Sequence, residues 1–67
     1  MFFAKNLKYL RKTKKINQDE ISTLLGKTRS AISSYENGKA EPTTGALLKL
    51  ANFFEVSIDE LLLEDLS

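Results

Sequence analysis

The chain of 67 residues contains neither cysteine nor histidine. Without cysteine there is no disulfide framework and no thiolate site. Without histidine the commonest metal ligand and the usual general base near neutral pH are both missing. Proline occurs once and glycine three times, and 42% of the residues are apolar, a composition typical of a globular chain rather than a fibrous or disordered one.

Long apolar runs are absent as well. No stretch approaches the roughly 18 to 20 apolar residues of a membrane span, and the opening segment MFFAK is too short for the core of a signal peptide. We therefore expect a cytoplasmic protein. The length accommodates one small domain over residues 1–67, which at this size buries only about 60% of the surface that its unfolded chain exposes.

The net charge is only +1, but it is unevenly distributed. Residues 1–39 hold nine lysines and arginines against three acidic residues, a net charge of +6, whereas residues 40–67 hold one lysine against six acidic residues, a net charge of −5. A basic surface attracts polyanions. The split is compatible with a nucleic-acid partner for the first part of the chain, and equally with an unevenly charged solvated surface.

Capping residues followed by apolar residues at helical spacing recur along the chain, and no stretch shows the period of two expected of strands. The pattern predicts five helices, over about residues 2–14, 18–26, 29–37, 44–55 and from 58 to beyond 62. The predicted N-caps are Asn17, Thr28, Thr43 and Ser57. Glycines at positions 26 and 38 are predicted to end the second and third helices.

The third helix, within TRSAISSYENGK at residues 28–39, has little bulk on one side. Serines there would let the helix backbone approach the floor of a major groove about 12 Å wide, where large side chains would hold it away. With about 100° of rotation per residue, the core side holds Ala31, Ile32 and Tyr35, and the opposite side holds Ser30, Ser33, Ser34 and Asn37.

Two short helices joined by a tight turn that contains glycine form the signature of a helix-turn-helix. The segment NQDEISTLLGKTRSAISSYENGKAEP closely resembles the DNA-binding motif of the Cro and phage-repressor (Xre-type) family. NLKYLR before it and TGALLKLANFFEVSIDELL after it also resemble that family. The resemblance implies an all-α, compact five-helix lambda-repressor-like domain that binds double-stranded DNA and needs no cofactor or metal. The residues that carry it are Gln18, Gly26, Ile32, Tyr35, Glu36, Asn37, Gly38 and Pro42.

Arg29 lies in the first turn of the third helix, where helix-turn-helix proteins present side chains to bases. Because arginine can bond the O6 and N7 of guanine together, Arg29 is the leading candidate for base readout. Ser30 and Ser34 are the next candidates. Thr28, the predicted cap, is placed with them, with a phosphate contact as an alternative role. The alternative is that these serines only cover a solvated face.

A second set of residues is expected to bind the DNA backbone, which orients a protein without reading sequence. The resemblance implies this role at the start of the second helix and just after the third helix. A lysine at position 39 is also compatible with an ordinary solvated side chain. The candidates are Asn17, Gln18, Ser33, Asn37 and Lys39.

Arg11 and Glu36 match a pair of residues that forms an internal ion pair in some phage repressors. The resemblance therefore implies a link between the first helix and the end of the third. The alternative is that Arg11 faces DNA or water. The two alternatives differ in their effect on stability, because a paired Glu36 would contribute more stability than a surface carboxylate.

Several apolar residues in the last third have no obvious position in the core, namely Leu48, Phe53, Leu63 and Leu66. We expect a homodimer through the last helix and its surroundings, with Phe53, Leu63 and Leu66 in the interface. A dimer would place two recognition helices about 34 Å apart, as a palindromic operator requires.

The favoured function is a transcriptional regulator, most simply a phage-like repressor that occupies an operator. Similar modules also begin longer repressors and serve as antitoxins, so a toxin is a further possible partner. The competing class is a helical adaptor whose acidic, apolar end binds another protein. An enzyme is the weakest interpretation, because serines without histidine provide no activated nucleophile.

Overall fold

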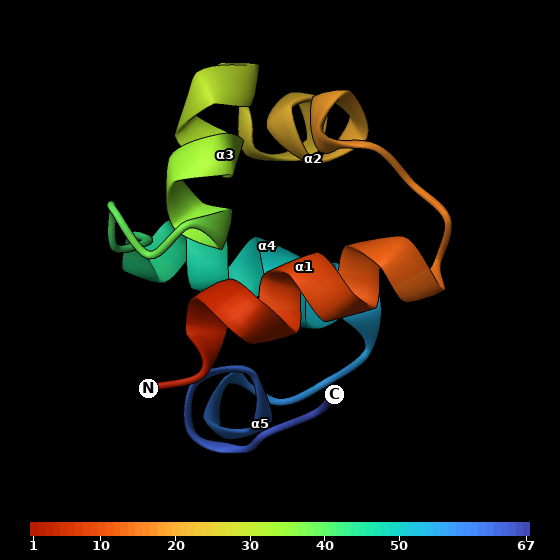
Figure 1. Ribbon diagram of the computed structural model, residues 1–67, viewed down its shortest axis with the longest axis vertical. Helices are drawn as coiled ribbons and strands as arrows, with labels where there is room; N and C mark the ends of the chain where they lie inside the picture. The colour runs from red at the N-terminus through yellow and green to blue at the C-terminus, as the bar shows by residue number, and fades with distance from the viewer.

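The computed structural model describes all 67 residues and contains five helices without any strand. This confirms the predicted all-α, five-helix fold (Figure 1). The second and third helices each end one residue earlier than predicted, because Gly26 and Asn37 are C-caps. The helices are α1 (Phe3–Thr13), α2 (Gln18–Leu25), α3 (Arg29–Glu36), α4 (Thr44–Phe54) and α5 (Ile58–Leu63).

All four predicted N-caps are present. In each case the cap's side-chain oxygen accepts a hydrogen bond from the backbone N–H three residues later, which satisfies one of the free donors at the start of a helix. Two of these helix starts, at Asn17 and Ser57, form complete capping boxes with Glu20 and Glu60. The caps are Asn17, Thr28, Thr43 and Ser57.

Left-handed residues follow four of the helices. Gly26 and Gly38, with φ of 65° and 72°, have this conformation as predicted. Glu55, the C-cap of α4, and Lys15, which follows α1, also adopt it, with φ of 57° and 59°. Because a side chain makes this conformation costly, neither of these two positions was predictable from residue type.

The hydrophobic core draws on all five helices. Phe3 of α1 and Tyr35 of α3 pack edge to face, with ring centroids 6.0 Å apart. Ala31, predicted to lie on the core side of its helix, is only half-buried. In α4, Ala46 is buried and the neighbouring Leu47 is half-buried. The core consists of Phe3, Leu7, Ile21, Leu25, Ile32, Tyr35, Ala46, Leu50, Phe54 and Leu61.

Asn6 is fully buried, which was not predicted from the sequence. Its side-chain nitrogen donates to the carbonyls of Leu61, at 2.9 Å, and Glu64, at 2.6 Å, and its oxygen accepts from the backbone N–H of Leu66 at 3.0 Å. Carbonyls at the end of a helix have no partner within it. Asn6 therefore supplies partners for the end of α5 and fastens the C-terminal segment to α1.

The helices are arranged so that α2 and α3 lie together at one end of the molecule and α5 lies at the other, with α1 and α4 between them (Figure 1). An ion pair between Lys5 Nζ and Asp65 Oδ1, 3.0 Å long, adds a second link between α1 and the C-terminal segment. None of the five helices is long and apolar enough to span a bilayer.

Candidate nucleic-acid interface

The start of α3 presents polar side chains to solvent while its other face packs on the core. Thr28, Arg29 and Ser30 are exposed, Ser33 and Ser34 are half-buried, and Ile32 is fully buried. The Thr28 hydroxyl oxygen accepts from the backbone N–H of Ala31 at 3.2 Å, so its own proton remains available to a ligand. The exposed face of α3 is therefore low and polar.

Arg29 makes no ion pair, since the two ion pairs of the molecule are Lys5–Asp65 and Arg11–Glu36. An exposed guanidinium without an internal partner retains all five of its donors for another molecule. Arg29 differs in this respect from Arg11, which donates hydrogen bonds to Glu36 and to the carbonyl of Ile16 inside the protein.

The start of α2 contributes two polar side chains. Asn17 Oδ1 accepts from the backbone N–H of Glu20 at 2.9 Å, which leaves the amide nitrogen of Asn17 free. Gln18 is half-buried, and its Nε2 donates to Glu36 Oε1 at 3.1 Å. The internal bond of Gln18 was not predicted from the sequence, which assigned this residue to DNA alone.

Arg11 and Glu36 lie together at the centre of a polar cluster. Arg11 Nε donates to Glu36 Oε2 at 2.6 Å and Nη2 donates to Oε1 at 3.0 Å, the two-pronged geometry of a strong guanidinium–carboxylate pair. Arg11 Nη1 also donates to the carbonyl of Ile16, at 3.0 Å. We name Arg11, Ile16, Gln18 and Glu36 the Glu36 cluster; it joins α1, the start of α2 and the end of α3.

The Glu36 cluster keeps both of its charged groups ionised. Burial raises the pKa of the Glu36 carboxyl, but hydrogen bonds from Arg11 and Gln18 lower it more, so the net pKa lies below its ordinary value. The hydrogen bond to Glu36 raises the pKa of Arg11 above an already high value. Opposite charges in direct contact thus form a neutral pair beside the end of α3.

The segment that follows α3 carries the remaining candidates for backbone contact. Asn37 and Lys39 are both exposed, and Lys39 makes no ion pair within the chain. Asn37 Nδ2 donates to Ser33 Oγ at 3.4 Å, a long bond that links these two candidates. Gly38, in the left-handed conformation, turns the chain between them.

The apolar residues proposed for a dimer interface are not equally exposed. Leu63 is 63% exposed and Phe53 38%, while Leu66 is half-buried. The ring of Phe53 packs edge to face on Phe54 and lies 5.7 Å from the Nζ atom of Lys14. Exposed apolar side chains also occur outside the last third of the chain, at Met1, Phe2 and Tyr9.

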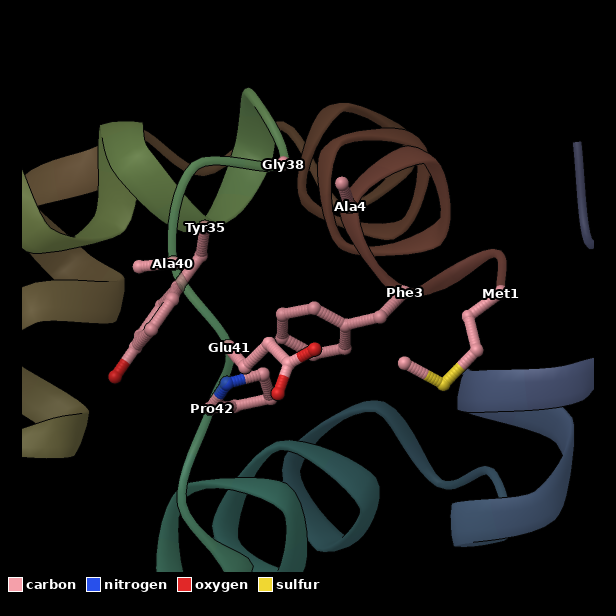
Figure 2. A pocket seen from close by; sticks show the side chains of 8 residues that line it. All are labelled: Met1, Phe3, Ala4, Tyr35, Gly38, Ala40, Glu41 and Pro42. Atoms are coloured by element: carbon pink, nitrogen blue, oxygen red, sulfur yellow. The ribbon is translucent and has the colours of Figure 1, made fainter.

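One pocket of about 170 Å³ lies between the start of α1, the end of α3 and the connector before α4. Figure 2 shows the ring of Phe3 in it, with the side chains of Glu41 and Pro42 on one side and Met1 on the other. Pockets that enclose small-molecule ligands are commonly about 300 to 1,000 Å³. The pocket is below that range.

The chain is similar to known proteins in sequence and in structure. A family model described as helix-turn-helix matches residues 7–61. The chain is 43% identical over 60 residues to the uncharacterized HTH-type transcriptional regulator YqaE of Bacillus subtilis, covering 90% of this chain and 52% of that protein. It is 40% identical over 62 residues to the HTH-type transcriptional activator BcrR of Enterococcus faecalis, covering 92% of this chain and 30% of that protein. The chain thus spans about half or less of the length of these relatives.

Among solved structures, the crystal structure of the P22 c2 repressor protein in complex with the synthetic operator 9T is similar to this chain with a TM-score of 0.87. The two are 31% identical in sequence, and the match covers 97% of this chain and 98% of the repressor chain. The similarity therefore includes all five helices and is not limited to α2 and α3.

Proposed function

The chain belongs to the helix-turn-helix family of Cro and phage-repressor type, whose members are DNA-binding transcriptional regulators, and on that premise we propose that it represses transcription by occupying a palindromic operator as a homodimer. The observation that carries this proposal is the exposed start of α3. There a guanidinium and small hydroxyls face solvent without charged partners inside the protein.

In this proposal α3 lies in the major groove with its first turn against the bases. Arg29 bonds a guanine through two donors. Ser30 and Ser34 are permissive, because a hydroxyl can donate or accept, and Thr28 uses the proton that its capping bond leaves free. One arginine with three hydroxyls makes a short direct code, so DNA shape and dimer spacing supply the rest of the specificity.

The start of α2 and the end of α3 bind the two neighbouring stretches of DNA backbone. Asn17 and Gln18 supply amide donors at the start of α2, which also favours anions through its free backbone N–H groups. Ser33 and Asn37, joined by a hydrogen bond, and the unpaired Lys39 do so at the end of α3. These contacts fix orientation and act on every sequence alike.

The operator symmetry is proposed to come from a two-fold dimer through Phe53, Leu63 and Leu66. Support comes from the exposure of Leu63 and Phe53 and from the position of α5 at the end of the molecule opposite α2 and α3 (Figure 1). Sedimentation at high protein concentration tests this arrangement. A monomer under those conditions, combined with non-cooperative binding to a selected site, would refute it.

Selection of duplexes from a random library, followed by titration of the selected site, tests DNA recognition. Arg29→Ala is expected to cost about 1 to 3 kcal/mol and to relax preference at one base position. The control Lys39→Ala is expected to weaken all sequences alike and to lower the salt dependence by about one phosphate contact. Equal losses from Arg29→Ala on selected and random DNA would remove its readout role.

The same titration separates a DNA-binding protein from an adaptor. A protein that releases counterions loses affinity linearly when the logarithm of the binding constant is plotted against the logarithm of salt concentration. An adaptor shows no duplex binding at low salt. Repression is tested by transcription in vitro from a promoter that overlaps the selected site, where added protein is expected to reduce transcript; an increase would indicate activation instead.

A further inference from the structure

Glu36 is shared by two donors that come from different helices. Its Oε1 accepts from Arg11 Nη2 at 3.0 Å and from Gln18 Nε2 at 3.1 Å, while its Oε2 accepts from Arg11 Nε at 2.6 Å. The Glu36 side chain is only 3% exposed. A buried carboxylate with this many donors is held in one orientation, and it in turn orients the donors.

Gln18 is the donor that retains an unused amide hydrogen. A glutamine amide nitrogen carries two hydrogens, and one of those of Gln18 is used by Glu36. The bond to Glu36 also fixes the orientation of the Gln18 amide group, because only the amide nitrogen, and not the amide oxygen, can donate to a carboxylate. The nitrogen of Gln18 is thus fixed at the start of α2 with its second hydrogen available, instead of rotating freely at the surface.

The negative charge of Glu36 is compensated, so the residue can lie close to a DNA-binding surface without repelling phosphates. A lone carboxylate there would repel phosphates, but the charge of Glu36 is balanced by Arg11 in direct contact. Arg11 also holds the carbonyl of Ile16, the residue before the cap of α2. The neutral Glu36 cluster therefore ties the start of α2 to the end of α3.

We propose that Glu36 is a positioning residue for DNA binding: it holds the amide of Gln18 so that its second N–H donates to a phosphate, without itself touching DNA. Through Arg11 and Ile16 the same carboxylate keeps the start of α2 at a set distance from Asn37 and Lys39, so that both ends of the motif contact the backbone together. This inference rests on the proposed function, since it requires that α2 and α3 bind DNA.

The decisive variant is Glu36→Gln, because charge and positioning predict opposite results. Removing a negative charge near DNA should by itself strengthen binding. A glutamine keeps only one acceptor oxygen for the donors of Arg11 and Gln18, so the hold on Gln18 is weakened and binding should fall by about 5-fold, close to the effect of one hydrogen bond. The matched control Glu41→Gln removes the same charge from an exposed residue of the connector and is expected to strengthen binding slightly. A phosphate contact ignores sequence, so a mixed-sequence duplex of about two helical turns serves as the probe.

A double-mutant cycle identifies the partner. Gln18→Met keeps the length of the side chain and removes both amide hydrogens, and is expected to weaken binding by about 5-fold. Glu36→Gln should then cause a smaller loss in the Gln18→Met background than in the wild type, because the part of its effect that acts through Gln18 is already gone. Stronger binding by Glu36→Gln in the wild-type background, or independent losses that multiply in the double variant, would overturn the proposal.

A measurement on the unmodified chain covers the case in which Glu36→Gln fails to fold. The side-chain amide of Gln18 is expected to be as rigid as the backbone by the nitrogen–proton nuclear Overhauser effect, and its nitrogen signal to shift when the mixed-sequence duplex is added. A mobile Gln18 amide refutes the positioning role, even if the protein binds DNA. Absence of duplex binding by the wild-type chain refutes the proposed function instead, which separates the two failures.

Discussion

α1 is fastened to the rest of the molecule by a polar side chain near each of its ends, and the two anchors differ in chemistry. Asn6 is neutral and fully buried, and it holds the end of α5. Arg11 is charged, its side chain is 13% exposed, and it holds the start of α2 and the end of α3. The neutral anchor lies at the end of the molecule remote from the helix-turn-helix, and the charged anchor lies beside it.

The difference shows how the cost of burying a polar group is offset in each place. A neutral amide needs only its hydrogen bonds to be satisfied, and four backbone groups around Asn6 do this. A guanidinium needs a counter-charge as well, and Glu36 provides it. The charged anchor is therefore sensitive to the loss of either partner and to pH, and the neutral anchor is sensitive only to the loss of Asn6.

The largest effect is expected from Arg11→Ala. It leaves the carboxylate of Glu36, 3% exposed, with Gln18 as its remaining donor. Breaking a buried ion pair from one side costs about 3 kcal/mol or more, a large part of the total stability of a small domain. Urea unfolding measures this loss, and Lys12→Ala, which removes an exposed cation from the same helix, is expected to change stability little.

Glu36→Ala should cost less than Arg11→Ala, about 2 kcal/mol, because the Arg11 guanidinium keeps its bond to Ile16 and some access to water. This asymmetry is specific to a carboxylate more deeply buried than its partner. A loss below about 1 kcal/mol, typical of a surface pair, would show that the charged anchor contributes no more than an exposed one.

The neutral anchor is expected to come next, with Asn6→Ala lowering the free energy of unfolding by about 2 kcal/mol. The substitution leaves the carbonyls of Leu61 and Glu64 without their buried donor. Affinity for DNA per folded molecule should be unchanged, because the hydrogen bonds of this anchor go to α5 and the C-terminal segment and not to α2 or α3. The control Asn52→Ala removes an exposed amide and should be neutral; a loss of DNA affinity in folded Asn6→Ala would contradict the division between the two anchors.

Acid distinguishes the anchors further. Burial raises the pKa of Glu36, but the hydrogen bonds of Arg11 and Gln18 bring it below its ordinary value of 4.5. Because the folded pKa lies below the unfolded one, the stabilisation is complete above about pH 4.5 and is lost as the pH falls through the folded pKa. Urea unfolding at decreasing pH should show this loss in the wild-type chain and a smaller loss in Glu36→Gln.

Two further variants isolate the source of that acid dependence. Asn6→Ala should lower stability equally at every pH, so its curve runs parallel to that of the wild type. The hydrogen bond from Lys5 also lowers the pKa of Asp65 below its ordinary value, so Asp65 contributes to the loss of stability in acid, and Asp65→Asn measures its part. If Asp65→Asn alone removed the acid dependence, Glu36 would not be its source.

The smallest effects are expected at glycines outside both anchors, and they have opposite signs. Gly45 is in the first turn of α4, and a methyl group added there would meet nothing closer than Thr43 Oγ1 at 4.0 Å. Gly45→Ala should therefore stabilise the fold by about 0.5 to 1 kcal/mol. Gly38→Ala should destabilise it by about 1 kcal/mol, because its φ is +72° although space is open around it. Thermal melts that moved in the same direction would contradict this account.

The helices were predictable because their limits depend on local chemistry. The Ser57 hydroxyl accepts from the backbone N–H of Glu60, and the Glu60 carboxylate accepts from the backbone N–H of Ser57. The whole capping box is therefore formed within four consecutive residues. The left-handed Glu55 was not predictable. Nothing about a glutamate favours that conformation; there the backbone N–H groups of Glu55 and Val56 donate to the carbonyls of Asn52, at 3.3 Å, and Ala51, at 3.0 Å, and close the end of α4.

The candidate interface was predictable in part. The exposed Arg29 and Ser30 are where helical spacing predicted them. The resemblance to phage repressors implied that Arg11 and Glu36 form a pair, and the structure places them in contact. The bond of Gln18 to Glu36 had no signal in the sequence, because a glutamine at the start of a helix has the same pattern whether it faces a ligand or a neighbouring side chain.

By itself the sequence determined five helices, their caps, the uneven charge and the identity of a helix-turn-helix, because each depends on residues within one or two turns or on composition. Only the tertiary structure decided that Asn6 lies buried against a segment about sixty residues away and that Glu36 unites Arg11 with Gln18. These contacts depend on where packing brings distant helices together. A polar residue on an apolar stripe, such as Asn6, shows only that some partner must exist, and the fold determines which one.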